Sequence, residues 1–141
     1  MTSTLAVLDI QRIGWGALKA HAKHERREIG DRSHTDPSKT PRNLAAGLDK
    51  CPEEAVKEYL GQTGAKIDKR NEKPFTRLLL SASPEYFRPG RAGQGGSYDL
   101  AQMKAWTKTS TAWLRKEFGS DLIHVALHLD ETTPHIHAVV V

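Results

Sequence analysis

The chain has 141 residues, of which 38% are hydrophobic and 27% are charged, and its formal net charge is +4. This length suits one domain with a core of ordinary size. No apolar run approaches the roughly 20 residues that cross a bilayer, and the N-terminus lacks the pattern of a secretory signal peptide. The only cysteine, Cys51, excludes an intramolecular disulfide and fits a reducing compartment, so we expect a cytoplasmic protein.

Basic residues gather in two stretches of the chain. The first contains Lys19, Lys23, Arg26, Arg27, Arg32, Lys39 and Arg42, and the second contains Lys66, Lys69, Arg70, Lys73 and Arg77. Such clusters favour a polyanionic partner, because each phosphate that is neutralised releases counterions. A solvated charged surface is the alternative, and charge alone does not decide between the two.

The first half of the chain predicts strands and helices separated by polar segments. Residues 4–13 alternate loosely and favour a strand, and residues 17–28 favour a helix. Residues 32–43 contain two prolines and predict an extended loop. A second helix is expected over 52–60, with Gly61 or Gly64 ending it, and residues 75–82 form an apolar run typical of a buried strand.

The second half predicts a loop, a long helix and a hairpin. Residues 89–96 contain four glycines and predict a mobile loop. Asp99 is a candidate N-cap for a helix to about Phe118, with its apolar stripe at Leu100, Met103, Trp106 or Thr107, Trp113 or Leu114, and Phe118. Gly119 ends this helix, and strands are expected over 122–129 and 135–141, joined by the turn 130–134.

This order of elements indicates an α/β layer protein of the α+β kind. We expect a central, mostly antiparallel sheet, closed by the final hairpin, with helices packed against one face. The chain ends inside the last expected strand, at Val139, Val140 and Val141. We therefore expect one domain over residues 1–141 that is the N-terminal fragment of a longer protein.

Chemistry concentrates in residues 128–137, which read HLDETTPHIH. On a strand, His135 and His137 point to the same face, and a tight hairpin would bring His128 to the same place. Three imidazoles with positions left open are typical of a catalytic metal site. Imidazole ligation suits Mn²⁺, Zn²⁺, Co²⁺ or Ni²⁺, and the residues do not choose among them.

Other residues near this segment have open roles. Glu131 or Asp130 would accept a proton beside the metal or hydrogen-bond a ligand imidazole. His124 shares the strand face of His128, and it is either a fourth ligand or a residue that flanks the site or contacts DNA. The competing interpretation is that the histidines are ordinary buried core residues.

Three stretches resemble motifs of the Mob/Pre (MobV-type) family of plasmid-mobilisation relaxases, within the HUH endonucleases. His135-Ile136-His137 resembles the HUH signature, and the whole 128–137 segment is similar to the family's third motif. His24 and Arg27 match the first motif, His-x-x-Arg. Residues 36–43 resemble an Asn/Asp-Pro-Ser-Arg-Ser-x-x-Asn element but have Lys39 and Thr40 where Arg and Ser are usual.

The resemblance implies an HUH relaxase-like fold and a metal-dependent transesterification. The family nicks one strand at an origin of transfer, stays joined to the 5′ phosphate and later rejoins the strand. It implies His24 as the nucleophile, Glu131 as the base and a divalent ion on His128, His135 and His137, with Mn²⁺ the leading expectation and Zn²⁺, Co²⁺, Ni²⁺ or Mg²⁺ the alternatives. The residues expected to contact DNA or support the site are Lys23, Arg26, Arg27, Arg42, Asn43, Arg70 and Arg77.

Several alternatives stay open at this point. Tyr59, Tyr86 and Tyr98 are competing nucleophiles, because most relaxases use a tyrosine. Arg88 and Arg91, in the glycine-rich loop, are expected to clamp the DNA strand. The expected partners are single-stranded and supercoiled DNA at an origin of transfer, together with relaxosome or coupling proteins bound through the missing C-terminal region. A small-substrate metallohydrolase and a non-catalytic DNA-binding replication-origin or repressor module are the rival functions.

Overall fold

A computed structural model describes residues 5–25, 44–45, 52–129 and 133–141, with only the backbone described for residues 21–25 and 44–45. Its centre is a five-stranded sheet in the order β1-β3-β5-β4-β2, and every neighbouring pair is antiparallel. The strands are β1 (Ala6–Ile13), β2 (Leu44–Ala45), β3 (Phe75–Ala82), β4 (Leu122–His128) and β5 (His135–Val140). The expected antiparallel sheet, with a hairpin as its last two strands, is therefore confirmed.

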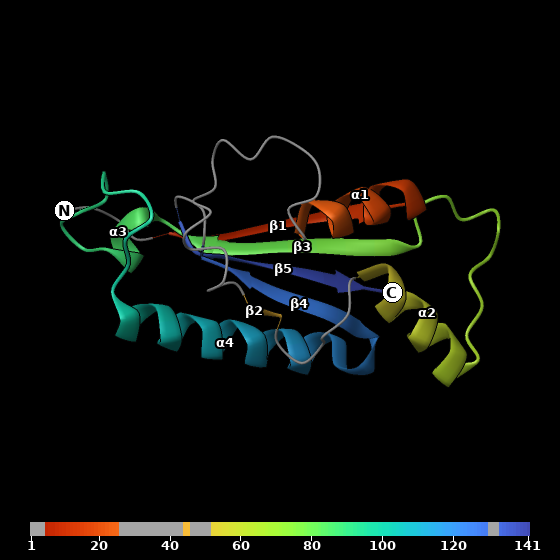
Figure 1. Ribbon diagram of the computed structural model, residues 1–141. Coiled ribbons are helices and arrows are strands. Elements are labelled where there is room, and N and C mark those ends of the chain that lie inside the picture. Colours follow the sequence, from red (N-terminus) through yellow and green to blue (C-terminus); the bar gives the residue numbers. More distant parts are fainter. Residues whose placement is uncertain (1–4, 26–43, 46–51, 130–132) are drawn as a thin grey trace.

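The helices are α1 (Trp15–Glu25), α2 (Pro52–Thr63), the short α3 (Pro84–Phe87) and α4 (Leu100–Phe118), and a 3₁₀ turn, η2, covers Gly119–Asp121. Figure 1 shows α4 running lengthwise beside the sheet near β4, while α1 and α2 lie toward the end where the chain reaches its C-terminus. No helix in the described part of the chain is long and apolar enough to cross a membrane.

One face of the sheet packs against α4. Leu78 and Leu80 of β3, Ile136 and Ala138 of β5, and Leu127 of β4 belong to one buried cluster. Met103 and Leu114 of α4 belong to the same cluster, and Phe87 of α3 joins them. Ile136 is fully buried, and burial of a side chain of this size stabilises the fold by about 1.5–3 kcal/mol.

The opposite face packs against α1 and α2. Phe75 and Val139 point to this face, because side chains alternate along β3 and β5. They share a second buried cluster with Leu18 of α1 and Val56 of α2. The expectation of helices on one face only is therefore wrong. Which face of the sheet a helix covers depends on the tertiary packing, so the local sequence pattern of α1 and α2 did not show that they cover a second face.

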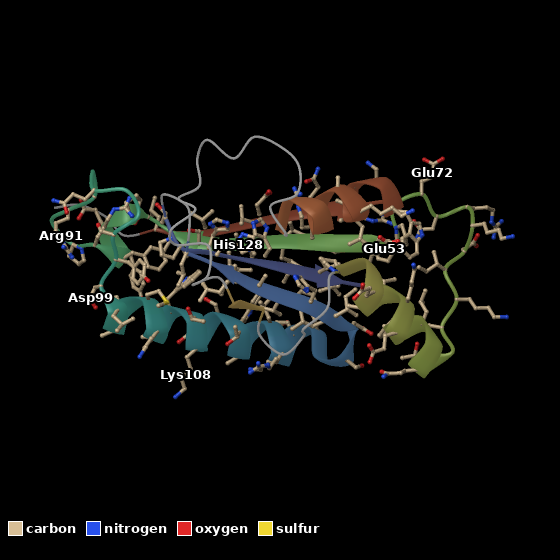
Figure 2. All side chains as sticks on the ribbon, viewed as in Figure 1. Glu53, Glu72, Arg91, Asp99, Lys108 and His128 are labelled. Atoms are coloured by element: carbon tan, nitrogen blue, oxygen red, sulfur yellow. The ribbon has the colours of Figure 1, made fainter. Side chains whose placement is uncertain are left out.

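Capping sets the limits of α4 as the sequence predicted. The Asp99 side chain accepts a hydrogen bond from the Gln102 amide at 2.9 Å, and Gly119 has a positive φ of 53° at the C-terminal end. The predicted stripe is correct for Met103 and Leu114, which are buried, but Leu100 is 55% exposed. Figure 2 shows Lys108 projecting from this helix away from the sheet.

Most observed strand limits agree with the limits predicted from the sequence, but the shortest elements were not predicted. The strand predicted over 75–82 is β3 itself, and α2 continues past Gly61 and ends before Gly64, whose φ is 68°. The two-residue β2, the four-residue α3 and η2 were not expected, because such short pieces carry no periodicity. The expected loop over 32–43 and the turn residues 130–132 lie outside the described part of the chain.

Candidate metal and nucleic-acid site

Three histidines converge where β4 pairs with β5. His128 lies directly opposite His135 in the ladder, and His137 lies one pleat further along, opposite Ala126. The ring centroids are 5.1 Å apart for His128 and His135, 4.9 Å for His128 and His137, and 4.8 Å for His135 and His137. One ring nitrogen from each histidine lies within 4.8 Å of the others, so the three could hold one metal ion.

The cluster lies inside the molecule rather than on a loop. His128 is 2% exposed and His135 is 9% exposed, and Figure 2 shows His128 within the body of the protein while Glu72 projects into solvent. Both strands hold the imidazoles on a backbone that is hydrogen-bonded on each side, because β4 and β5 are interior strands. A ligand set on such strands is more rigid than one on loops.

The backbone next to His135 indicates which ring nitrogen carries the proton. The Nδ1 atom of His135 lies 3.1 Å from the carbonyl oxygen of Thr133. A carbonyl oxygen only accepts hydrogen bonds, so Nδ1 carries the proton and Nε2 keeps its lone pair. This arrangement, in which a backbone carbonyl orients a histidine, is common around metal ligands.

His124 lies on the same face as the cluster but is not part of it. Its partner across the ladder is Val139, and it is 2% exposed. Among the described residues, the group able to hold a metal ion contains His128, His135 and His137, without His124. The ligand role for His124 is therefore not supported by the geometry. Asp130 and Glu131 lie outside the described residues.

The helix that carries His24 packs on the histidine face of the sheet. Leu18 of α1 is fully buried in the cluster that contains Val139, and Val139 shares its face with His135 and His137. His24 and Lys23 lie in the last turn of α1, where only the backbone is described. Arg26, Arg27, Arg42 and Asn43 lie outside the described residues, so their expected roles stay predictions.

The two remaining basic residues of the predicted site occupy different environments. Arg77 of β3 points to the histidine face, because it is the ladder partner of Val139 in β5. Its guanidinium donates a hydrogen bond of 2.6 Å to Gln11 Oε1. Arg70 lies in the exposed segment before β3 and forms a 2.9 Å ion pair with Asp68. This guanidinium lowers the pKa of the Asp68 carboxyl, mainly through the side-chain hydrogen bond. The fold thus brings Arg77, but not Arg70, to the face that carries the histidines.

Arg88 does not clamp DNA in this conformation, so that expectation is wrong. Its side chain is 1% exposed, and Nε donates to the Ala92 carbonyl at 3.0 Å. Burial lowers the pKa of its guanidinium. The 89–96 segment forms no helix or strand, as predicted, but consecutive turns organise it. Arg91 is exposed in this segment, and Figure 2 shows it at the outer end of the molecule, near α3.

Tyr86 and Tyr98 lie on the other face of the sheet from the histidine cluster, whereas Tyr59 packs against the buried cluster on the histidine face. Tyr86 and Tyr98 pack against the buried cluster on the α4 face of the sheet. The Tyr59 hydroxyl donates a 2.7 Å hydrogen bond to Asp121 Oδ1, which raises the pKa of Tyr59. A raised pKa disfavours the phenolate, the nucleophilic form of tyrosine.

Two residues near the site were not expected from the sequence. Ser81 of β3 donates a 2.8 Å hydrogen bond from Oγ to the carbonyl of Pro134, the residue before His135. Asp9 of β1 shares a row of the histidine face with Leu79 and His137, since Asp9 pairs with Leu79 and Leu79 pairs with His137. The sequence gives no signal for either, because both placements depend on which strands are neighbours.

Known proteins resemble this chain in sequence and in fold. A plasmid recombination enzyme of Bacillus thuringiensis is 23% identical over 137 residues, which make up 94% of this chain and 29% of that protein. The chain therefore spans less than a third of that relative's length.

Two solved structures of the MobM relaxase domain share the fold. One, Mn-bound at pH 5.5 with a 22-nucleotide piece of plasmid pMV158 oriT DNA, has a TM-score of 0.76 at 19% identity and matches 97% of this chain and 70% of that chain. Another, Mn-bound at pH 6.8 with oriT DNA that carries a 3′-thiophosphate, has a TM-score of 0.75 at 22% identity with the same coverage.

The family model of the plasmid recombination enzymes matches residues 2–141, which is nearly the whole chain. The resemblance inferred from the histidine motifs is therefore confirmed, and the chain belongs to the plasmid recombination enzyme family.

Proposed function

We propose that this chain carries the DNA-nicking activity of a plasmid-mobilisation relaxase. The observation that carries the proposal is the convergence of His128, His135 and His137 on the sheet face against which α1 packs. The proposed reaction is a strand-specific transesterification at an origin of transfer. It leaves a covalent link between the protein and a 5′ phosphate, and it is reversed when the strand is rejoined. Residues 1–141 are proposed to act as part of the catalytic domain.

The metal site is proposed to bind a divalent ion through His128, His135 and His137. Mn²⁺ is the leading candidate, in line with the Mn-bound MobM structures, and Zn²⁺, Co²⁺, Ni²⁺ and Mg²⁺ are alternatives. An ion held there would withdraw negative charge from the oxygens of the scissile phosphate. Three neutral imidazole ligands would leave further coordination positions of the ion open for phosphate oxygens.

His24 is the proposed nucleophile, and Glu131 is the proposed base. The neutral imidazole nitrogen attacks phosphorus, a P–N bond forms, and the bond from phosphorus to the 3′ oxygen breaks. The imidazole then gives its proton to Glu131, and the departing 3′ oxygen takes up one proton, so the net product is a phosphoramidate and a free 3′-hydroxyl. The placement of Tyr86 and Tyr98 on the α4 face supports a histidine over these two tyrosines.

The proposed substrate is the single strand of supercoiled plasmid DNA at an origin of transfer, in the cytoplasm. Arg77 supports this proposal, because it lies on the histidine face. Lys23, Arg26, Arg27, Arg42, Asn43 and Arg70 are the other proposed DNA-contacting or supporting residues. Contacts with relaxosome or coupling proteins are a further part of the proposal.

The test is a nicking assay on a supercoiled plasmid that carries the cognate origin. The protein is incubated with the plasmid and Mn²⁺, with and without EDTA, and products are separated on a denaturing gel beside His24→Ala and Tyr98→Phe variants. A nick that requires metal, leaves DNA attached to protein and disappears only in the His24 variant is the expected result.

Other outcomes separate the rival functions. Loss of the adduct in Tyr98→Phe instead would keep the relaxase function and replace the nucleophile. DNA binding that survives EDTA without any cleavage would favour a non-catalytic binding module. Hydrolysis of small substrates without a covalent adduct would favour a metallohydrolase.

A further inference from the structure

Arg88 is a buried charged residue whose guanidinium donates hydrogen bonds to other groups of the protein. At 1% exposure it has left water, which is costly for a charge unless hydrogen bonds replace the lost hydration. Nε donates to the Ala92 carbonyl at 3.0 Å, and one terminal nitrogen donates to the Ser97 carbonyl at 3.3 Å. The planar fork of donors thus holds the glycine-rich segment between α3 and α4 at its middle, Ala92, and just after its last residue, at Ser97.

The remaining donor of the Arg88 guanidinium lies near Thr133, two residues before the proposed metal ligand His135. The other terminal nitrogen of Arg88 lies 3.5 Å from Thr133 Oγ1, which is longer than the roughly 2.7–3.2 Å of most N–H···O hydrogen bonds. The carbonyl of the same residue, Thr133, lies 3.1 Å from His135 Nδ1. One residue therefore receives the Arg88 side chain and orients the His135 imidazole.

Ser81 holds the next residue of the same segment from the other side. Its 2.8 Å hydrogen bond to the Pro134 carbonyl joins the end of β3 to the residue before His135. Pro134 has a locked φ and no amide hydrogen, so this carbonyl is the hydrogen-bonding group that its backbone offers. Thr133 and Pro134 are thus held by side chains from two other parts of the fold.

We propose that Arg88 is a positioning residue that orients His135 by holding Thr133. By tying the glycine-rich segment to Thr133, Arg88 keeps the Thr133 carbonyl against Nδ1 and so keeps the proton on Nδ1, which leaves Nε2 as the ligand atom for a metal ion. Ser81 supports the same geometry at Pro134. Only the expected change in metal affinity rests on the proposed metal site. The orientation of His135 is a property of the metal-free protein and can be tested without metal.

The test measures the tautomer of His135 by imidazole ¹⁵N NMR on the metal-free protein at about pH 8, above the ordinary histidine pKa of about 6.5. Arg88→Lys keeps the charge but loses the fork of donors, and Thr133→Val removes the hydroxyl while keeping the shape and the backbone carbonyl. Arg91→Gln is the matched control, because Arg91 lies in the same segment but is exposed. Circular dichroism shows whether each variant is folded.

In the wild type and in Arg91→Gln we expect the Nδ1–H form alone. In Arg88→Lys and in Thr133→Val we expect a mixture with the Nε2–H form, together with a Mn²⁺ dissociation constant raised about tenfold, the size of effect typical of groups that orient ligands. A single Nδ1–H form in folded Arg88→Lys and in Thr133→Val would overturn the proposal. If Arg88→Lys does not fold, Thr133→Val decides alone.

The two measurements also keep this inference separate from the proposed function. If the wild type binds no Mn²⁺, the metal site proposal fails, and the tautomer comparison still decides whether Arg88 positions His135. If Mn²⁺ binds with equal affinity in all variants and the tautomer is unchanged, the metal site stands and the role of Arg88 is overturned.

Discussion

His128 and His135 are direct partners across the β4–β5 ladder, with ring centroids 5.1 Å apart. Directly opposed residues on an antiparallel pair have their Cβ atoms about 4.5–5.5 Å apart, so the two imidazoles meet without any distortion of the strands. His137 joins them because it lies two residues from His135, on the same face. A two-strand ladder is thus sufficient to assemble the three-histidine cluster.

Mn²⁺ is expected to stabilise the protein through this cluster. At a free concentration about a hundred times the dissociation constant, a ligand that binds only the folded state stabilises it by about 2.7 kcal/mol. Thermal unfolding with Mn²⁺ and then with excess EDTA measures the effect. His128→Ala should lose it, and His124→Gln should keep it, because His124 is outside the cluster. An equal Mn²⁺ effect in His128→Ala would contradict the proposed ligand set.

Arg77 is expected to matter more than Arg70 for binding of single-stranded DNA. Arg77 lies on the histidine face beside the neutral Gln11, whereas Arg70 is paired with the Asp68 carboxylate. Loss of one phosphate contact should lower the slope of log K against log salt by about 0.7. We expect this change in Arg77→Gln and a smaller one in Arg70→Gln, measured by fluorescence anisotropy at several salt concentrations. The reverse order would place the DNA path along the segment before β3 instead.

Gly14 is expected to tolerate no side chain where β1 leads into α1. A Cβ atom there would lie against the Glu72 carbonyl oxygen, closer than van der Waals contact allows, whereas a Cβ atom at Gly16 meets nothing within 4 Å. Gly14→Ala should destabilise the protein by about 1–3 kcal/mol in urea denaturation. The matched control, Gly16→Ala, should be neutral or stabilising by up to about 1 kcal/mol, because alanine favours the helix. Equal stabilities would show that the loop at Glu72 moves aside.

Tyr59 is expected to ionise at higher pH than an ordinary tyrosine, whose pKa is about 10. The hydrogen bond to Asp121 and the negative charge of that carboxylate favour the neutral phenol, and this raises the pKa. The folded-state pKa lies above the unfolded one, so the stabilisation is present below about pH 10 and is lost as the pH rises through the folded-state value. Tyrosinate absorbance during a pH titration measures it. Tyr59→Phe should remove the late component, and Asp121→Asn should move it to lower pH.

The Asp99 cap is expected to contribute to the stability of α4. Its carboxylate accepts a hydrogen bond from the Gln102 amide at 2.9 Å, and loss of such a cap costs about 1 kcal/mol. Asp99→Ala should lower the free energy of unfolding by about this amount, and Asp99→Asn should restore most of it. The comparison in urea denaturation separates the cap from the charge of the carboxylate.

The local elements and the three histidines of the last hairpin could be predicted from short-range features of the sequence. The apolar run over Phe75–Ala82, the cap at Asp99 and the glycine at 119 are short-range signals, and β3 and α4 have the limits that they predicted. The spacing of His128, His135 and His137 was also sufficient, because a hairpin brings its two strands together without help from the rest of the chain. The family followed from the same motifs.

The residues that surround those histidines could not be predicted, because they come from parts of the chain that only the folded sheet brings together. That Leu79 is the neighbour of His137, that Ser81 reaches Pro134, and that α1 covers the histidine face all depend on the strand order β1-β3-β5-β4-β2. Arg88 shows the same limit most clearly, since an arginine in a glycine-rich segment suggests an exposed DNA contact, yet it is 1% exposed. Burial of a charge depends on acceptors that are far away in the sequence, and Thr133 is 45 residues from Arg88.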